Sequence, residues 1–194
     1  MDCDIAEAKR KLRGDILAWR AALSDAERHA AARDLHKIFL RERPVEAPCV
    51  VSGFWPIKDE IDIRPLMTEL FNQGCQLALP VVQGRGQPLR FRAWRPGEPL
   101  EKGVFGTLQP PAAGEVPVEP DALIVPLLAC DPGGWRVGYG GGFYDRTLMD
   151  LRARRNVTAI GVAFDGQCVA AVPHGPDDQR LDWLLTERRA CAFV

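Results

Sequence analysis

Glycine, arginine and aspartate residues are concentrated between Arg136 and Arg146, where the chain reads RVGYGGGFYDR. Glycine lets a backbone adopt positive φ and approach a ligand closely. If a helix begins directly after such a loop, its first backbone amides are unpaired and bind anions, above all phosphates. Arg136 and Arg146 would add positive charge, and Asp145 is well placed to hold a divalent metal beside a phosphate. The stretch therefore predicts an anion site next to a carboxylate.

The glycine spacing differs from that of the two best-known phosphate loops. The chain has no G-x-x-x-x-G-K-[ST] sequence, and the third glycine of a G-x-G-x-x-G motif would fall at Phe143. The flanking patterns still suit such a loop. An apolar run at 122–128 is typical of a buried strand, a turn follows at 131–134, and apolar residues recur at helical spacing over 148–151. The predicted order is strand, glycine-rich loop and helix, and a mobile glycine-rich surface loop is the less favoured alternative.

The same stretch resembles the signature of the 5-formyltetrahydrofolate cyclo-ligase family, also called 5,10-methenyltetrahydrofolate synthetases. The family pattern is an apolar strand, an aspartate, a glycine turn and then R-[apolar]-G-x-G-x-G-[FY]-Y-D-R. Residues 136–146 fit the last part at every defined position. The resemblance implies ATP as co-substrate and Mg²⁺ as cofactor. The residues that it places around ATP are Lys9, Arg13, Arg136, Val137, Gly138, Tyr139, Gly140, Gly141, Gly142, Phe143 and Tyr144.

Matching positions elsewhere in the chain extend the implied site. Lys9 and Arg13 fit the K-x-x-x-R pattern of the family's first helix, whose two cations reach the nucleotide. The helical pattern alone would make them a solvated basic face. Trp55 and Glu60 fit positions after the family's first strand, where the glutamate contacts the folate, and a carboxylate suits the paired donors of a pterin ring. The implied folate-binding residues are Trp55, Glu60, Tyr139, Gly140, Gly141, Gly142 and Phe143.

Two aspartates are implied as metal ligands. Asp145 lies in the glycine-loop signature, and Asp178 fits the first aspartate of a pattern near the family's C-terminus. Without the resemblance, Asp178 would be interpreted as a solvated loop acid. Gln109 stands where glutamate is common in the family, which is a small departure. The resemblance covers residues 9–187, which is nearly the whole chain.

The implied reaction is the ATP-driven cyclisation of 5-formyltetrahydrofolate to 5,10-methenyltetrahydrofolate. ADP and phosphate are the other products, and a phosphorylated formyl group, an iminium phosphate, is the intermediate. Tyr139 and Tyr144 are hypotheses for positioning the formyl group or the phosphate. Three alternatives stay open: an ATP-binding relative of the same fold with a different substrate, a non-catalytic sugar-phosphate or CoA-binding module, and a structural protein. The aromatic–carboxylate pair argues against the first, the two aspartates against the second, and the glycine loop against the third.

Length and composition limit the other possibilities. A chain of 194 residues, 46% apolar, is long enough for one domain with a real core, and we expect a single domain over 1–194. A net charge of −1 gives no general nucleic-acid surface, and no apolar run approaches a membrane span. The charged N-terminus does not resemble a signal peptide. We therefore expect a cytoplasmic monomer acting on small molecules, without nucleic-acid or membrane partners.

The cysteines do not indicate a metal site. The six cysteines form no C-x-x-C pair and the chain has only three histidines, which argues against zinc and for a reduced compartment. Cys130 lies beside the glycine loop and is a candidate nucleophile. A core position is the preferred interpretation because no histidine is nearby in the sequence.

Strands that alternate with helices predict an α/β fold with a mostly parallel central sheet flanked by helices. The resemblance implies the arrangement shared by NagB/RpiA-type isomerases and CoA transferases. A capping box at Ser24 and Glu27 marks the start of the second helix. The stretch 110–120 is predicted to be a connecting loop. Helices are expected over 5–22, over 25–40, from 60–66 to about 74, and after 143, and strands over 49–55, 76–82, 88–94, 122–128 and 156–163.

Overall fold

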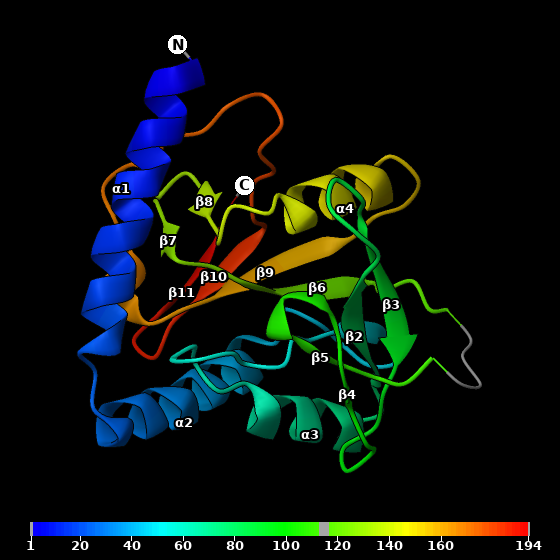
Figure 1. The fold of residues 1–194 in the computed structure, drawn as a ribbon. Coiled ribbons are helices and arrows are strands. Elements are labelled where there is room, and N and C mark those ends of the chain that lie inside the picture. The colour runs from blue at the N-terminus through cyan, green and yellow to red at the C-terminus, as the bar shows by residue number, and fades with distance from the viewer. Residues whose placement is uncertain (1, 113–116, 194) are drawn as a thin grey trace.

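Seven strands form one sheet at the centre of the computed structural model, which describes residues 2–112 and 117–193 (Figure 1). Their spatial order is β11-β10-β9-β6-β1-β2-β3. The five inner strands run parallel, and the edge strands β3 and β11 run antiparallel to their neighbours. The strands span Val50–Ser52 (β1), Gln76–Val82 (β2), Leu89–Ala93 (β3), Ala122–Pro126 (β6), Thr158–Val162 (β9), Trp183–Leu185 (β10) and Ala190–Ala192 (β11).

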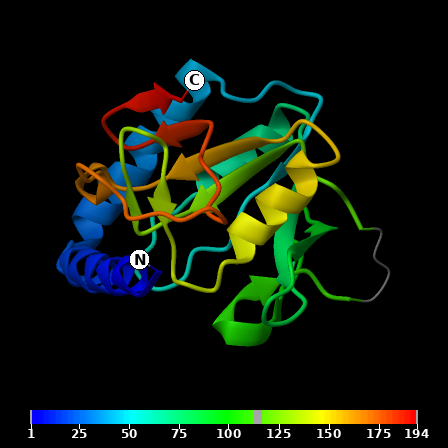
Figure 2. The same cartoon turned by 90° about the horizontal axis from the view of Figure 1, so that it is seen from above.

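Helices cover both faces of this sheet, as a parallel sheet requires. Helices α2 and α3 lie below the sheet and α4 lies above it (Figure 1). Helix α1 stands at one side and the edge strand β3 at the other (Figure 2). The helices span Asp2–Ala21 (α1), Asp25–Glu42 (α2), Arg64–Asn72 (α3) and Phe143–Arg152 (α4).

The side-chain alternation of the strands separates two layers of core. In β2, Leu77 and Leu79 pack with α2 and α3, whereas Ala78 between them belongs to the cluster around α4. In β6, Ile124 joins the first layer and Leu123 the second. Successive strand residues point to opposite faces, so a strand buried on both faces is apolar throughout. This explains why the apolar run at 122–128 became a central strand.

Two short hairpins lie outside the main sheet. One pairs β4 (Glu101–Lys102) with β5 (Leu108–Gln109), and a 3₁₀ turn, Val104–Gly106, closes it. The other pairs β7 (Ala129–Cys130) with β8 (Arg136–Val137). Ile16 of α1 packs against this second hairpin in a third, smaller apolar cluster. The β7–β8 hairpin therefore fixes α1 beside the glycine loop. A further 3₁₀ turn spans Asp165–Gln167.

The predicted fold class is confirmed: the protein is α/β, with a mostly parallel sheet flanked by helices. The capping box is also present, since the Ser24 side chain accepts from the Glu27 amide and the Glu27 carboxylate accepts from the Ser24 amide. Several details differ. The first strand is shorter than 49–55 because the chain leaves the sheet after Ser52. The β7–β8 hairpin and the strands β10 and β11 were not predicted. Part of the 110–120 connector lies outside the described residues.

Candidate active site

A pocket of about 810 Å³ opens where the inner strands end. Phe54 follows β1, Val82 ends β2 and Pro126 ends β6, and all three line it. The N-terminus of α4 lies in the same wall. Ligands of open α/β sheets bind at the carboxyl ends of the strands, so this is the expected place for a site. The residues that the family resemblance places at the site all line it: Lys9, Arg13, Trp55, Glu60, Arg136, Val137, Gly138, Tyr139, Gly140, Gly141, Gly142, Phe143, Tyr144, Asp145 and Asp178. Arg146, which was also expected to add charge, is not among the lining residues, because its side chain donates to the Gly141 carbonyl and lies over the Phe143 ring.

The glycine loop turns the chain from β8 into α4 with left-handed backbone conformations. Gly140 has φ +97° and Gly142, the N-cap of α4, has φ +63°. A Cβ atom on Gly140 would stand 3.3 Å from the guanidinium carbon of Arg13. Arg13 Nε donates to the Gly138 carbonyl at 2.8 Å. Glycine is therefore required at 140, both for the turn and for the close approach of α1.

The first turn of α4 carries Asp145, which is held by two donors. Arg136 Nη2 donates to Asp145 Oδ1 at 2.7 Å, and the Gln179 amide donates to the same oxygen at 3.1 Å. A second Arg136 nitrogen donates to the Gln179 carbonyl. The Arg136 side chain is almost fully buried. Arg136 thus joins β8, α4 and the loop before β10, and it balances the aspartate rather than standing free in the pocket.

Lys9 and Asp178 also form an ion pair. Lys9 Nζ lies 2.7 Å from Asp178 Oδ1 and 2.5 Å from Oδ2, and the Gly175 amide donates to Oδ2 at 2.7 Å. Both side chains are mostly buried. The residues are 169 positions apart in the sequence. Their contact brings the first helix against the loop before β10 and closes one end of the pocket.

Asp131 anchors the loop that carries Asp178. Its two carboxylate oxygens accept from the backbone amides of Trp135 at 3.1 Å and Val172 at 2.9 Å. The His174 ring then stacks on the Trp135 ring, with 3.9 Å between centroids and 7° between planes. His174 is therefore a packing residue.

A divalent metal fits this donor set only with help from a ligand. The described residues contain no group of three histidine, cysteine or acidic side chains that could hold a metal. Asp145 and Asp178 both line the pocket, and each already has a cationic partner. Mg²⁺ commonly takes one or two protein carboxylates and completes its shell with water and substrate phosphates. Two aspartates beside an anion-binding loop match that pattern.

The opposite wall of the pocket is aromatic and acidic. Glu60 Oε2 accepts from the Ile57 amide at 2.9 Å, whereas Glu60 Oε1 is buried without a hydrogen-bond partner among the described residues. Burial is the largest influence on the pKa of Glu60 and raises it above the ordinary value. Trp55 is half-buried, packs edge-on against Trp94, and has the Arg64 guanidinium over its ring. The pair combines a flat apolar surface with a buried acceptor that has no hydrogen-bond partner among the described residues.

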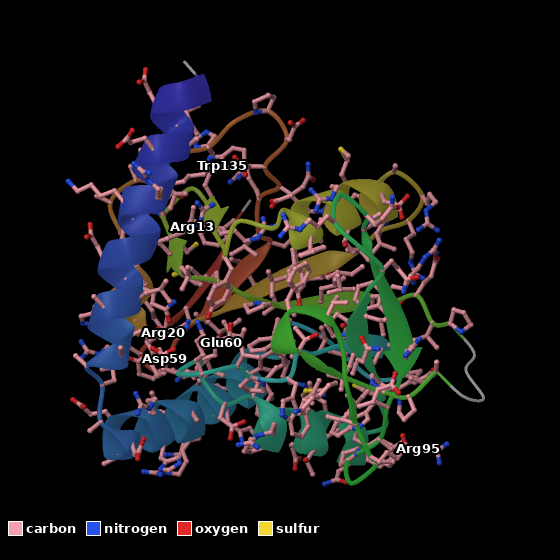
Figure 3. The ribbon with its side chains drawn as sticks, in the orientation of Figure 1. Arg13, Arg20, Asp59, Glu60, Arg95 and Trp135 are labelled. Atoms are coloured by element: carbon pink, nitrogen blue, oxygen red, sulfur yellow. The ribbon has the colours of Figure 1, made fainter. Side chains whose placement is uncertain are left out.

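Behind this wall lie Arg20 and Asp59, neither of which was predicted from sequence. Arg20, near the C-terminal end of α1, is 1% exposed and its Nη2 donates to Asp59 Oδ1 at 3.0 Å and to the Tyr139 hydroxyl at 2.5 Å. Figure 3 shows Arg20 and Asp59 side by side, with Glu60 close to them. One signal was available: Arg20 follows Arg13 by seven residues, about two helical turns, so both lie on the same face of α1.

From sequence, Phe105 could be interpreted either as a wall of a ligand pocket or as a core residue, and the structure places it at the pocket. It is the central residue of the Val104–Gly106 turn, with φ +59°, and 58% of its surface is exposed. Its ring lies 5.9 Å from that of Phe143 at the start of α4. A large apolar side chain that is exposed at a pocket, on a strained backbone, is typical of a ligand contact.

The structure does not support Cys130 as a nucleophile. Cys130 is 1% exposed in the core around α4, and burial raises its pKa to about 12. A thiol so seldom ionised is a poor nucleophile, which supports its interpretation as a core residue.

Among the helices of the described chain, none is both long and apolar enough to cross a membrane.

Comparisons with known proteins agree with one another. The sequence profile described as the 5-formyltetrahydrofolate cyclo-ligase family matches residues 5–187. A protein of Mycolicibacterium smegmatis named 5-formyltetrahydrofolate cyclo-ligase is 32% identical over 189 residues, which cover 94% of this chain and 95% of the relative.

Solved structures give the same result. The NMR structure of a 5,10-methenyltetrahydrofolate synthetase of Aquifex aeolicus superposes with a TM-score of 0.74 at 31% identity, covering 95% of this chain and 92% of the other. A structure with the same enzyme name from Mycoplasma pneumoniae has a TM-score of 0.73 at 22% identity, with 92% and 98% coverage, and is similar in fold.

Proposed function

Because the chain belongs to the 5-formyltetrahydrofolate cyclo-ligase family, we propose that it catalyses the ATP- and Mg²⁺-dependent cyclisation of 5-formyltetrahydrofolate to 5,10-methenyltetrahydrofolate. One observation carries this proposal beyond the family name. Residues predicted for the nucleotide, the folate and the metal come from distant parts of the chain, and they line one pocket. A pocket of about 810 Å³ is in the usual range for small-molecule sites, so the two substrates can meet in it.

The nucleotide half consists of the glycine loop, the N-terminus of α4 and the cations of α1. The unpaired amides of the first helical turn attract phosphate oxygens, and the loop glycines allow close approach. Lys9 and Arg13 reach this region from the opposite side. When triphosphate binds, Lys9 can exchange its contact with Asp178 for a phosphate oxygen. The aspartate oxygens then become free to face the metal.

The folate half consists of Trp55, Glu60 and the phenylalanines at the pocket mouth. Glu60 Oε1 lies buried without a partner among the described residues, so a ligand donor would satisfy it. The amino and N–H groups of a pterin ring are such donors. Trp55, Phe105 and Phe143 offer flat surfaces for the rest of the ring system.

The chemistry needs alignment more than a protein nucleophile. The formamide oxygen of the substrate is a poor leaving group. Transfer of the γ-phosphoryl group of ATP to this oxygen releases ADP and gives an iminium phosphate. N10 then attacks the formyl carbon and loses its proton, the C–O bond breaks, and phosphate leaves. The side chains of the pocket hold the two substrates in line and neutralise the phosphate charge.

The metal would be held by Asp145 and Asp178. When bound, Mg²⁺ neutralises charge on the β- and γ-phosphates and so makes phosphoryl transfer easier. Arg136 stays with Asp145 and fixes the orientation of this carboxylate. The loop at 172–178, anchored through Asp131, keeps the second carboxylate at the edge of the pocket.

The direct test is to mix the purified protein with (6S)-5-formyltetrahydrofolate and Mg-ATP and to follow the absorbance of the methenyl product. An ATP-dependent rise, with one ADP formed per product, is expected. If ATP binds but no methenyl product forms, the folate assignment is wrong, and a relative that uses the same nucleotide loop on a different substrate becomes the better description.

The metal role predicts a specific variant effect. Asp145→Asn keeps the size of the side chain and can still accept from Arg136, but it lacks the charge that a metal needs. We expect turnover to fall by about a hundredfold or more, and the melting temperature to fall as well, because the buried Arg136 loses its balancing charge. Asp150→Asn, on the exposed face of the same helix, is the matched control and should retain turnover. Turnover of Asp145→Asn at the level of that control would exclude the metal role.

A further inference from the structure

Arg20 is a buried charged residue, and burying its charge costs free energy unless the charge is paired. Its side chain is 1% exposed, and a buried cation must be paired. Burial lowers the pKa of Arg20, but the contacts with Asp59 and Tyr139 outweigh it and raise the pKa above its ordinary value. Arg20 is therefore a permanent positive charge, fixed behind the pocket wall between α1, the loop after β1 and the glycine loop (Figure 3).

A purely structural ion pair would need Asp59 alone. The second contact, to Tyr139, reaches into the site. Tyr139 lines the pocket and is 40% exposed, yet its hydroxyl is turned inward to Arg20 at 2.5 Å. The Arg20 guanidinium also lies 5.7 Å from the centroid of the Tyr139 ring. Arg20 therefore determines how the Tyr139 ring is presented at the exposed centre of the glycine loop.

The Glu60 carboxylate lies under the same influence. The titratable groups that face it are Arg20 from α1, Asp59 from its own loop, Tyr139 from the glycine loop and Tyr144 from α4. Burial raises the pKa of Glu60, and the bond from the Ile57 amide, the charge of Arg20 and the nearby Tyr139 hydroxyl oppose this increase. Arg20 is the one cation in that set, so its charge favours the ionised form of the buried carboxylate.

We infer that Arg20 is a positioning residue for the folate half of the pocket: it orients Tyr139 and holds the Glu60 carboxylate ready for the donors of the pterin ring, without touching either substrate. This inference rests on the proposed function. The inference assigns different roles to the two ends of α1. Lys9 and Arg13 serve the nucleotide, whereas Arg20, about two turns further on, serves the second substrate.

The test compares Arg20→Met with Arg10→Met, the same change at an exposed position of the same helix. KM values for 5-formyltetrahydrofolate and for ATP are measured separately. In Arg20→Met, the KM for the folate should rise by about tenfold or more, because charge-assisted contacts are lost, and the KM for ATP should stay within about twofold. Arg10→Met should match wild type, and Arg20→Lys, which keeps the charge, should restore part of the loss.

The pH dependence of the KM for the folate distinguishes a positioning role of Arg20 from a purely structural one, because a purely structural role would not change it. The KM for the folate should rise as pH falls and Glu60 takes up a proton. Without the positive charge of Arg20 the pKa of Glu60 is higher, so in Arg20→Met this rise should begin at a higher pH than in wild type. An unshifted profile would overturn the inference.

Tyr139→Phe keeps the test decisive if Arg20→Met does not fold. It removes one hydroxyl from a partly exposed ring, and it should raise the KM for the folate selectively by about threefold to tenfold. If Tyr139→Phe leaves that KM unchanged, or if both KM values rise equally in Arg20→Met, Arg20 only stabilises the fold and the inference is wrong. If the wild-type protein forms no methenyl product, the proposed function fails and the inference fails with it. Activity in wild type with no selective change in the variants refutes the inference alone.

Discussion

At the scale of single residues, Glu60 and Cys130 show how position changes the chemistry of a side chain. Both groups are buried, and for both burial raises the pKa. Glu60 lines the pocket, has the charge of Arg20 near it and has one buried oxygen without a partner among the described residues, whereas Cys130 packs in the apolar core around α4. The first arrangement suits ligand binding and the second suits packing.

We expect Glu60→Gln to weaken folate binding and to remove its pH dependence. Glutamine has the same shape, but its amide offers one acceptor in place of two and can turn a donor toward the donors of the ligand. The KM for 5-formyltetrahydrofolate should rise by about tenfold or more. In wild type this KM should rise as pH falls, and the rise should begin at a higher pH than for an ordinary glutamate, because burial raises the pKa of Glu60. A Glu60→Gln profile as steep as that of wild type would show that another group titrates.

We expect Cys130 to be inert in the folded protein. A thiol with a pKa of about 12 has on the order of a thousandfold less thiolate at pH 8 than an ordinary cysteine. Alkylation by iodoacetamide, followed by peptide mass spectrometry, should label Cys130 only after unfolding in denaturant. Cys130→Ser should keep its turnover. If that variant folds normally but loses turnover, the cysteine acts as a nucleophile after all.

At the scale of elements, the glycine loop depends on α1. The loop turns at Gly140 and Gly142, and Arg13 lies so close that a methyl group at 140 would make a tight contact with its guanidinium. The contact between Ile16 and the β7–β8 hairpin keeps α1 in this position. The loop conformation therefore depends both on its own glycines and on a helix that lies more than a hundred residues earlier in the sequence.

Gly140→Ala adds only one methyl group, but it should reduce turnover strongly. Alanine is strained at φ +97°, and its Cβ would stand 3.3 Å from the Arg13 guanidinium, so the loop must shift. We expect turnover to fall by at least about tenfold, with a cost in unfolding free energy of about 1 to 2 kcal/mol. Turnover and chemical denaturation are measured together.

Gly14→Ala is the control for that change. Gly14 lies inside α1, and within 4 Å of the added Cβ there is open space as far as the described residues extend. The same substitution should there stabilise the protein by about 0.5 to 1 kcal/mol and leave turnover intact. If the two glycines behave alike, the strained conformation at 140 does not matter.

At the scale of the whole molecule, the pocket joins segments that are far apart in sequence. The ion pair of Lys9 with Asp178 links α1 to the loop before β10, and Arg20 links α1 to the loop after β1. A ligand that bridges these segments stabilises the native state because it binds the assembled pocket and not the unfolded chain.

Mg-ATP at about a hundred times its dissociation constant should therefore raise the melting temperature by about 5 to 10 °C. Lys9→Met should reduce this shift, whereas Lys37→Met, a change at an exposed ion pair on α2, should not. Removal of the metal with EDTA should reduce the shift in all three proteins. Differential scanning fluorimetry measures each case, and a shift that is independent of Lys9 would remove it from the nucleotide site.

Much of this protein could be predicted from local sequence. The capping box of α2, the strand at 76–82 and the strand–loop–helix order around 136–146 depend on neighbouring residues, so the pattern was sufficient for them. The β7–β8 hairpin was missed because two-residue strands have no periodicity to detect. The strand β11 was missed because its short apolar run carries no alternation of its own.

The site residues divide in the same way. Glycines at 140 and 142 were predictable because positive φ is a local requirement that side chains restrict. Only the tertiary structure placed Arg20 with Asp59 and Tyr139, and Lys9 with Asp178. Helical spacing states which face of α1 a residue occupies, but not what is packed against that face. Burial and charge pairing are properties of the assembled molecule, because they depend on atoms that only folding brings together.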